Sequence, residues 1–316
     1  MMLSQWLTTP APDVAVEIDH THVAAARLSW RGSQAVIAGH ASEPLPNGLV
    51  TPGLGELNIG DVPAVAKAIT RTLSQLGGQR PSRVSLVVPD TVARVTLLPL
   101  ENVPARPADL QEIVRWQVRK TAPFPIEQAA VSVSPGARGA DGGAEYVVAL
   151  ARTDVIHQYE QACLMAGAHA GLVELSTFGV INGVMAGAAP TGDWLLVHVT
   201  DTYLTMAVIR GREMLFFRNR GLQEGAPADM VHQTAMYYED RLHGFGFSQV
   251  LIAGAARLPG GAEQVRRGLE DRLRSSVAAI DPRSAAALTD RIGASPELLD
   301  ELAPLVGLLL RDRKAA

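Results

Sequence analysis

The expected fold is decided by residues 14–41, which read VAVEID (14–19), HVAAARLSW (22–30), a turn at Gly32 and QAVIAGHA (34–41). Short apolar runs separated by turn residues are typical of antiparallel β-strands. A second stretch has the same order: WLLVHVTD (194–201), YLTMAVIR (203–210), a turn at Gly211 and EMLFFRNR (213–220). Each stretch therefore predicts a three-stranded meander.

The spacing of the two stretches indicates a duplication. Val197 follows Val16 by 181 residues and Gly211 follows Gly32 by 179, so the first hairpin is two residues longer and the alternation of its strands is preserved. In both stretches a helix and then a buried strand come next. We infer a duplicated α/β domain. Chance similarity is the alternative, because short strand patterns are degenerate.

The first half contains extra residues with a different order of elements. They predict a strand at 93–100, a helix from about Pro107 to Thr121, and strands at 127–135 and 144–152. The glycine-rich run 136–143 predicts the hairpin between the last two strands. We therefore expect a small strand-helix-strand-strand subdomain over residues 92–152.

Composition narrows the class of protein. Apolar residues make up 47% of the 316 residues and charged residues 19%, which predicts a folded chain with a sizeable core. The net charge of −4, with acids and bases mixed, gives no electrostatic footprint for nucleic acid or an anionic membrane. One cysteine, Cys163, excludes an intramolecular disulfide and indicates a reducing compartment. Without a long apolar run or a signal-peptide pattern, we expect a cytoplasmic protein.

The run VRWQVRKTAPFPIEQAAV (114–131) is the most specific segment of the chain. It resembles the PilM family of type IV pilus assembly proteins, in which an arginine-containing helix leads through a Pro-Phe-Pro turn into a strand. Other segments resemble the same family: 84–100, 146–178, 204–220, 250–260 and 303–311. The family has an actin-like (ribonuclease H-like) ATPase fold, and is related to the cell-division protein FtsA and to the cytoplasmic domain of the type II secretion protein GspL.

The resemblance implies a domain division and a role. The first actin-like half would comprise residues 11–91 and 153–190, the insertion 92–152, and the second half 191–316. The role would be that of a cytoplasmic platform of a pilus or related type II secretion machine, held at the inner membrane by its partners. Such proteins bind the cytoplasmic N-terminal peptide of the inner-membrane protein PilN in a groove beside the insertion. PilO and the motor ATPases would be reached indirectly, and we expect no nucleic-acid partner and no direct membrane insertion.

An actin-like nucleotide site needs hairpin turns that hold phosphates by backbone N–H groups, and acids that hold Mg²⁺. The family's first turn reads approximately Asp-Ile-Gly-Ser. By the resemblance it corresponds here to the run Glu17, Ile18, Asp19 and His20, which Thr21 follows. The acid is one carbon longer, and Asp19 replaces the glycine that would let a phosphate approach the backbone.

The second turn, commonly Asp-x-Gly in the family, corresponds to His198, Val199 and Thr200, followed by Asp201. The acid and the glycine of this second turn are both replaced. Gly254 is at the position that faces adenosine in the family. We therefore expect no resident cofactor, weak or absent Mg-ATP binding and no enzymatic activity. The alternatives are an active actin-like ATPase whose Mg-ATP binding regulates assembly, and a sugar-kinase-like enzyme; both need intact phosphate loops.

The sequence gives little support for a metal site or for a catalytic nucleophile. His20 and His22 are spaced to share a strand face, but no further ligands converge on them, so we expect no metal site. Cys163 lies on the same apolar helix stripe as Val155 and Tyr159, which predicts a buried, inert thiol. No Walker A loop or Gly-x-Ser-x-Gly elbow occurs.

The helix of the insertion supplies the candidate partner-binding residues. Trp116 falls outside its apolar face, near Arg119, and tryptophan and arginine are enriched in interfaces. We assign partner binding to Arg115, Trp116, Arg119 and Phe124. The alternative is that Trp116 packs against the turn at 123–125.

Overall fold

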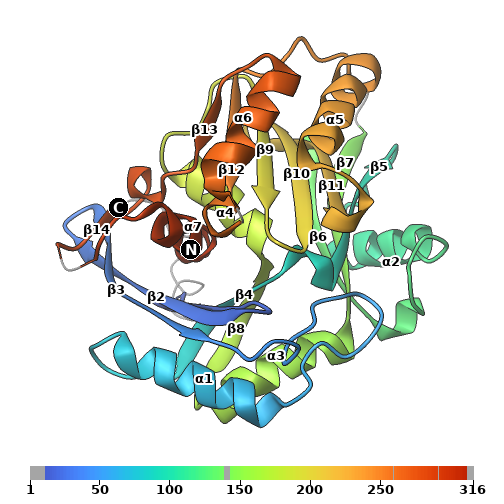
Figure 1. Ribbon diagram of the computed structural model, residues 1–316. Coiled ribbons are helices and arrows are strands. Elements are labelled where there is room, and N and C mark those ends of the chain that lie inside the picture. Colours follow the sequence, from blue (N-terminus) through green and yellow to red (C-terminus); the bar gives the residue numbers. More distant parts are fainter. Residues whose placement is uncertain (1–10, 139–142, 259, 291, 312–316) are drawn as a thin grey trace.

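The computed structural model describes residues 11–138, 143–258, 260–290 and 292–311. Two α/β halves lie against each other, and a small three-stranded subdomain flanks them (Figure 1). Residues 139–142 of the predicted hairpin lie outside the described residues. Within the described ranges, no helix has the length and apolar character needed to span a membrane.

The first half is built on a six-stranded sheet with the order β14-β3-β2-β1-β4-β8. Its strands are β1 (Val14–Ile18), β2 (His22–Arg31), β3 (Gln34–Pro44), β4 (Arg83–Val88), β8 (His169–Leu175) and β14 (Ala287–Leu288). One face is covered by α1 (Val62–Gln75) and α3 (Thr153–Met165), the other by α7 (Pro296–Leu310). Asp61 is the N-cap of α1, where its Oδ1 accepts the Ala64 N–H at 2.9 Å.

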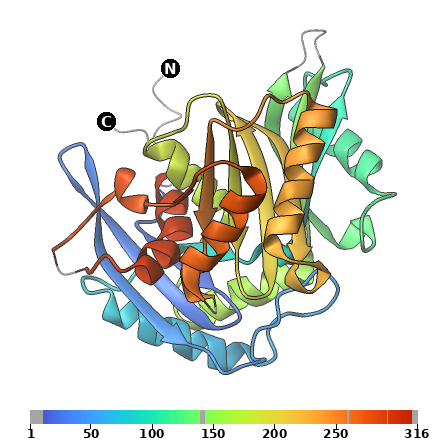
Figure 2. The same ribbon diagram turned by 45° about the horizontal axis from the view of Figure 1, so that its top comes forward.

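The second half is built on a five-stranded sheet with the order β11-β10-β9-β12-β13. Its strands are β9 (Asp193–Val199), β10 (Tyr203–Arg210), β11 (Glu213–Gly221), β12 (Gln249–Ala253) and β13 (Val277–Ala279). Helices α5 (Pro227–Leu242) and α6 (Gly261–Leu273) pack on one face, in front of the strands in Figure 2. Helix α4 (Ser176–Ala186) packs on the other face.

The two sheets repeat the same local topology around their central strands. Val16 of β1 lies between antiparallel β2 and parallel β4, opposite Ala25 and Leu86. Val197 of β9 lies between antiparallel β10 and parallel β12, opposite Met206 and Ile252. The predicted equivalence of Val16 and Val197 is confirmed, and with it the duplicated α/β architecture.

The insertion is a three-stranded sheet, ordered β5-β7-β6, with one helix on its face. Its elements are β5 (Ala93–Leu100), α2 (Pro107–Val118), β6 (Ala129–Arg138) and β7 (Ala144–Arg152). The predicted strand-helix-strand-strand order is confirmed. The helix ends three residues before the predicted Thr121, because the N–H groups of Thr121 and Ala122 both turn back to the Val118 carbonyl and Pro123 follows.

Segments from each half cross to the other half. β14 pairs in parallel with β3, and α7 packs on the first sheet, although residues 191–316 are the predicted second half. Conversely, α4 precedes residue 190 but packs on the second sheet. The physical reason is that α7 is buried all round from Glu301 to Leu310, so it needs a sheet on one side and α4 on the other. The boundary at 190/191 stays a prediction, but it does not separate the packing units.

Helices α4 and α7 cross at a contact between small residues. A Cβ on Gly307 would collide with the backbone carbonyl of Gly179 and the backbone N of Gly183. Gly179 in turn lies against the Pro304 backbone. The two halves are therefore joined backbone to backbone at the base of the space between the β1–β2 and β9–β10 turns.

Candidate functional site

A cleft of about 290 Å³ lies between the two halves, where the β1–β2 and β9–β10 turns face each other. The turns have the same backbone geometry, because the Asp19 N–H donates to the His22 carbonyl at 3.0 Å and the Thr200 N–H to the Tyr203 carbonyl at 2.9 Å. Of the predicted nucleotide-site residues, seven line this cleft: Glu17, Asp19, Thr21, His198, Thr200, Asp201 and Gly254. The eighth, His20, does not line the cleft, but its side chain contacts Asp201, which does.

His20 joins the two turns across the cleft. Its Nδ1 lies 2.8 Å from Asp19 Oδ1 and its Nε2 3.0 Å from an Asp201 carboxylate oxygen. The hydrogen bond to Asp19, helped by the charges of both aspartates, raises the pKa of His20 to about 9. The imidazole is therefore cationic at neutral pH, donates from both nitrogens, and bridges the two halves as an ion pair.

Glu17 lies at the end of β1 and is 8% exposed. Burial, and then the charge of Asp19, raise the pKa of Glu17 to about 8, although Ser176 Oγ donates to Glu17 Oε1 at 3.2 Å. This carboxyl is therefore protonated at neutral pH. A protonated acid is a poor ligand for Mg²⁺, which prefers ionised oxygen donors.

Asp90 is the buried centre of a second network, in the short 3₁₀ segment Asp90–Val92 that precedes β5. It accepts hydrogen bonds from the Thr177 N–H at 3.0 Å, from the Thr177 hydroxyl, and from Thr205 Oγ1 at 2.6 Å. Its carboxylate lies 3.8 Å from His198 Nδ1. Burial opposes the charge, but the contacts from His198 and the two threonines outweigh it and lower the pKa of Asp90. Asp90, which follows β4 of the first half, thus joins that half to α4 and the second sheet.

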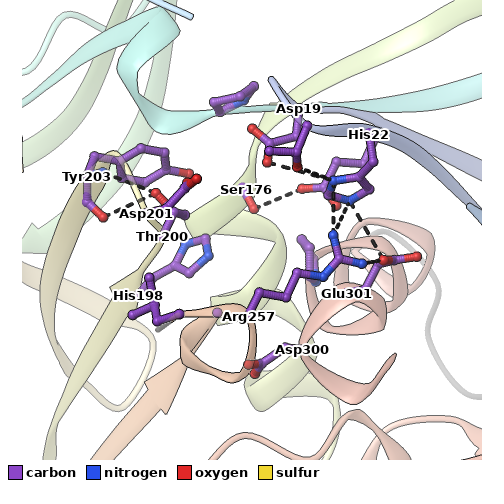
Figure 3. A pocket seen from close by; sticks show the side chains of 16 residues that line it. Asp19, His22, Ser176, His198, Thr200, Asp201, Tyr203, Arg257, Asp300 and Glu301 are labelled. Carbon is purple, nitrogen blue, oxygen red and sulfur yellow. Dashed lines mark hydrogen bonds and ion pairs between the residues drawn. The ribbon is translucent and has the colours of Figure 1, made fainter. Parts of the chain in front are cut away.

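Arg257, on the 3₁₀ turn after β12, lies on the side of the cleft next to α7 (Figure 3). Arg257 forms an ion pair with Glu301 of α7 and lies 3.1 Å from His22 Nδ1. His40 Nε2 lies 2.6 Å from the same carboxylate. Burial and the Arg257 charge lower the pKa values of His22 and His40 to about 4, so both rings are neutral.

Gly254 has a packing reason to be glycine. Its φ is +79°, and a Cβ there would collide with the Val199 carbonyl and lie 3.0 Å from the His198 ring. The close packing of Gly254 against β9 therefore explains why this residue is glycine, and no contact with adenosine is needed to explain it.

Several contacts in the cleft occupy groups that Mg-ATP would need. Thr200 Oγ1 accepts the N–H groups of Thr202 at 3.2 Å and Tyr203 at 3.1 Å, which are donors a phosphate would need. Five acids line the cleft, namely Glu17, Asp19, Asp201, Asp300 and Glu301, and Arg257 is already paired with one of them. A polyphosphate would meet carboxylates and occupied donors.

Other sequence-based site predictions have these outcomes. His20 and His22 both lie near Asp19, at 2.8 and 3.9 Å, but His20 also contacts Asp201 whereas His22 contacts Arg257. Within the described ranges, no group of three or more His, Cys, Asp or Glu is arranged to hold a metal. Burial raises the pKa of Cys163 to about 12, as a buried thiol requires. Sequence reasoning missed Asp90 and Arg257, because their partners lie far away in the chain and no local motif marks them.

The predicted partner-binding residues lie on and beside α2. Trp116 is 72% exposed, so the alternative that it packs against the 123–125 turn is wrong. Arg115 donates to the Ala129 carbonyl at 3.1 Å and Phe124 packs in the core of the insertion, so both serve the subdomain itself. Arg119 pairs with Glu127 at the surface, at 3.1 Å.

A groove of about 840 Å³ lies on the other side of the insertion. Its lining comes from the loop before α1, from the start of β5 and the 3₁₀ segment before it, from β11, and from three further residues. These residues are Gly48 and residues 50–54, Thr91 and residues 93–95, Phe217, Arg218, Asn219 and Gly221, and His20, Thr202 and Gln223. The first half, the insertion and the second half therefore all contribute to it. None of the four predicted partner-binding residues lines this groove.

Comparisons with known proteins agree with this architecture. No family model and no curated protein matches the chain. Among solved structures, a chain described as the "PilM-PilN type IV pilus biogenesis complex" aligns with a TM-score of 0.80 at 17% identity, over 96% of this chain and 99% of that one.

More distant structures share the fold. The cytoplasmic domain of EpsL, an inner-membrane component of the type II secretion system of Vibrio cholerae, aligns with a TM-score of 0.50 at 9% identity, over 95% of each chain. The ethanolamine utilization protein EutJ from Carboxydothermus hydrogenoformans aligns with a TM-score of 0.50 at 9% identity, over 96% of this chain and 90% of that one. The duplicated actin-like fold with its insertion is thus confirmed, and the resemblance to PilM extends over nearly the whole chain.

Proposed function

We propose that this protein is a cytoplasmic platform of a type IV pilus, or related type II secretion, machine. It would hold the extended cytoplasmic N-terminal segment of a PilN-like inner-membrane protein, and through it reach a PilO-like protein and the motor ATPases. The protein would then lie at the inner membrane without inserting into it.

The observation that carries the proposal is the groove shared by all three structural units. At about 840 Å³ it is almost three times the volume of the cleft, and it runs between a loop, a strand start and a strand edge. Such a shape suits a linear segment better than a compact ligand. The likeness to a chain solved in a PilM-PilN complex supports the choice of partner.

The groove proposal is tested by titrating a synthetic peptide of the first 12 or so residues of the PilN-like partner into the full chain by calorimetry. Gly53 lines the groove and a Cβ there meets no atom within 4 Å, so Gly53→Arg introduces a long cationic side chain at the groove without a clash at the Cβ. Gly55→Arg is the matched control, because Gly55 also has open space but lies outside the lining.

We expect saturable binding that G53R abolishes and that G55R preserves. Trp116→Ala separates this site from the exposed face of α2. If W116A removes binding while G53R does not, the partner binds α2 and the groove assignment is wrong. If no variant binds the peptide, and neither does the native chain, the platform role itself fails.

We also propose that the cleft binds Mg-ATP weakly or not at all. Support comes from the His20 bridge, from the turn N–H groups occupied by Thr200, and from the acidic lining. The measurement is calorimetry with Mg-ATP at millimolar concentration. A dissociation constant below about 10 μM, or roughly −7 kcal/mol of binding, would favour the alternative of an active ATPase that regulates assembly.

A further inference from the structure

The 3₁₀ segment Asp90–Val92 and the residue before it pass between the cleft and the groove. Pro89 lines the cleft and Thr91 lines the groove, while Asp90, between them in the chain, is 1% exposed. Neither cavity is lined by Asp90. Its carboxylate therefore acts on both cavities only through the residues that it holds.

Hydrogen bonds from this short segment reach two separate walls of the groove. The Thr91 hydroxyl donates to the carbonyl of Pro52, which lies in the groove-lining loop before α1, at 3.3 Å. On the other side, Thr205 Oγ1 donates to Asp90 Oδ2 at 2.6 Å. The same Oγ1 accepts from Nδ2 of Asn219, a groove-lining residue of β11, at 2.8 Å. The loop wall and the β11 wall are thus joined through two adjacent residues.

The Thr205 hydroxyl is the buried link in this chain of bonds. Thr205 is 0% exposed, and it lies directly opposite Asn219 in the β10–β11 ladder, so the two side chains share a face of the second sheet. A hydroxyl has one proton, which Thr205 gives to Asp90, so it can only accept from Asn219. Because the pKa of Asp90 is lowered, the acceptor is an ionised carboxylate, and hydrogen bonds to such groups are short and strong.

The walls that these bonds join belong to different units of the fold. The loop before α1 is part of the first half, β11 is part of the second, and the 3₁₀ segment leads directly into the insertion. A cavity between separate units keeps its width only if something fixes the units relative to one another. Walls that are already in place need no ordering when an occupant binds, which favours binding without any new contact.

We propose that Asp90 and Thr91 are positioning residues for the groove, which hold its loop wall and its β11 wall at a fixed spacing. The identity of the occupant rests on the proposed platform function, but the spacing is a property of the free protein. Asp90 acts on the affinity of the groove without touching what binds there.

Thr205→Val tests the proposal, because it removes the linking hydroxyl, keeps the β-branched shape and changes no residue that lines the groove. Thr234→Val is the matched control. Thr234 is 1% exposed, and its hydroxyl contacts Met206 Sδ and the Met230 carbonyl on the α5 face of the same sheet. Each variant loses one buried hydroxyl, so a general loss of stability would affect both.

Calorimetry with the partner peptide measures the effect on affinity. We expect T205V to bind the peptide about 10-fold more weakly than the native chain, because its walls must be ordered on binding, whereas T234V should stay within about 2-fold. Equal affinities of the two variants would refute positioning by Asp90 while leaving the platform function in place.

Amide NMR spectra of the free protein test the spacing without a partner. T205V should shift the amide resonances of Thr51, Gly53 and Leu54, which the lost hydroxyl reaches through Asp90 and Thr91, and T234V should leave them unchanged. Shifts confined to β11 in T205V would refute the link to the loop wall. If the native chain binds no peptide, the platform function fails, and the loop resonances of T205V still decide whether the two walls are joined.

Discussion

Replacing Glu17 by glutamine is expected to stabilise the protein at and above neutral pH. The Glu17 carboxyl lies at the end of β1, where burial and the Asp19 charge raise its pKa to about 8, against 4.5 in the unfolded chain. At pH 7 it is therefore protonated when folded and ionised when unfolded. Glutamine keeps an oxygen for the Ser176 hydroxyl and removes the titration.

The sign and magnitude follow from proton linkage. The folded state binds one more proton than the unfolded state between pH 4.5 and 8, so the free energy of unfolding falls as pH rises through this window and is flat above it. Each pH unit in the window corresponds to about 1.4 kcal/mol. The advantage of glutamine should thus rise from under about 1 kcal/mol at pH 5 to roughly 3 kcal/mol at pH 7.

The assay is urea unfolding of both proteins at pH 5, 6, 7 and 8. Glu56→Gln, at an exposed carboxylate in the loop, is the control and should change stability by less than about 0.5 kcal/mol at every pH. An E17Q effect that does not depend on pH, or that is larger at pH 5 than at pH 8, would show that Glu17 is ionised in the folded chain and that the description of the cleft is wrong.

Three further substitutions test the contacts between the halves. Gly307→Ala should cost about 3 kcal/mol or more in urea unfolding, because its Cβ meets the Gly179 carbonyl, whereas Gly293→Ala, with open space, should stay within about 0.5 kcal/mol. Asp90→Asn should cost about 2–4 kcal/mol by the same assay, because Thr177 and Thr205 lose an ionised hydrogen-bond acceptor and His198 loses a nearby negative charge; an unchanged free energy of unfolding would show that Asp90 does not hold the halves together. His20→Ala should cost about 1–2 kcal/mol below pH 6.5, where the imidazole is charged in both states, and its deficit should vanish as pH rises through about 9; a deficit that persists at pH 10 contradicts the ion-pair bridge.

The sequence predicted the architecture well, because the architecture depends on local patterns. Alternating apolar strands and the glycine turns at Gly32 and Gly211 are signals within about ten residues of chain, and both meanders formed where these signals occur. Asp61 caps α1 because a carboxylate at that position satisfies a nearby N–H whatever the rest of the chain does. The crossing of α4 and α7 between the halves carries no comparable local signal, and the sequence boundary at 190/191 does not anticipate it.

The residues of the candidate site were predicted only in part. The reason is again that the sequence shows local patterns but not contacts between distant residues. The candidate residues of the two turns converge because each turn follows a central strand of a duplicated sheet. Asp90 and Arg257 could not be found in this way, since Asp90 meets Thr177 and Thr205 at separations of 87 and 115 residues. On α2, an amphipathic pattern placed Trp116 outside the apolar face, but it could not show that Arg115 and Phe124 are used inside the subdomain.

The polar groups that face the cleft are bound to one another, and this determines what a nucleotide would have to displace. A phosphate reaching the β9–β10 turn must replace Thr200 Oγ1 at two backbone N–H groups, and entry between the turns must separate His20 from Asp201. A partly exposed ion pair contributes up to about 1 kcal/mol and each neutral hydrogen bond about 1 kcal/mol. Displacing all three costs about 3 kcal/mol, or roughly a hundredfold in affinity, before the repulsion from the acidic lining is counted. Because the His20–Asp201 pair joins the first half to the second, a ligand that separated it would also loosen the contact between the halves.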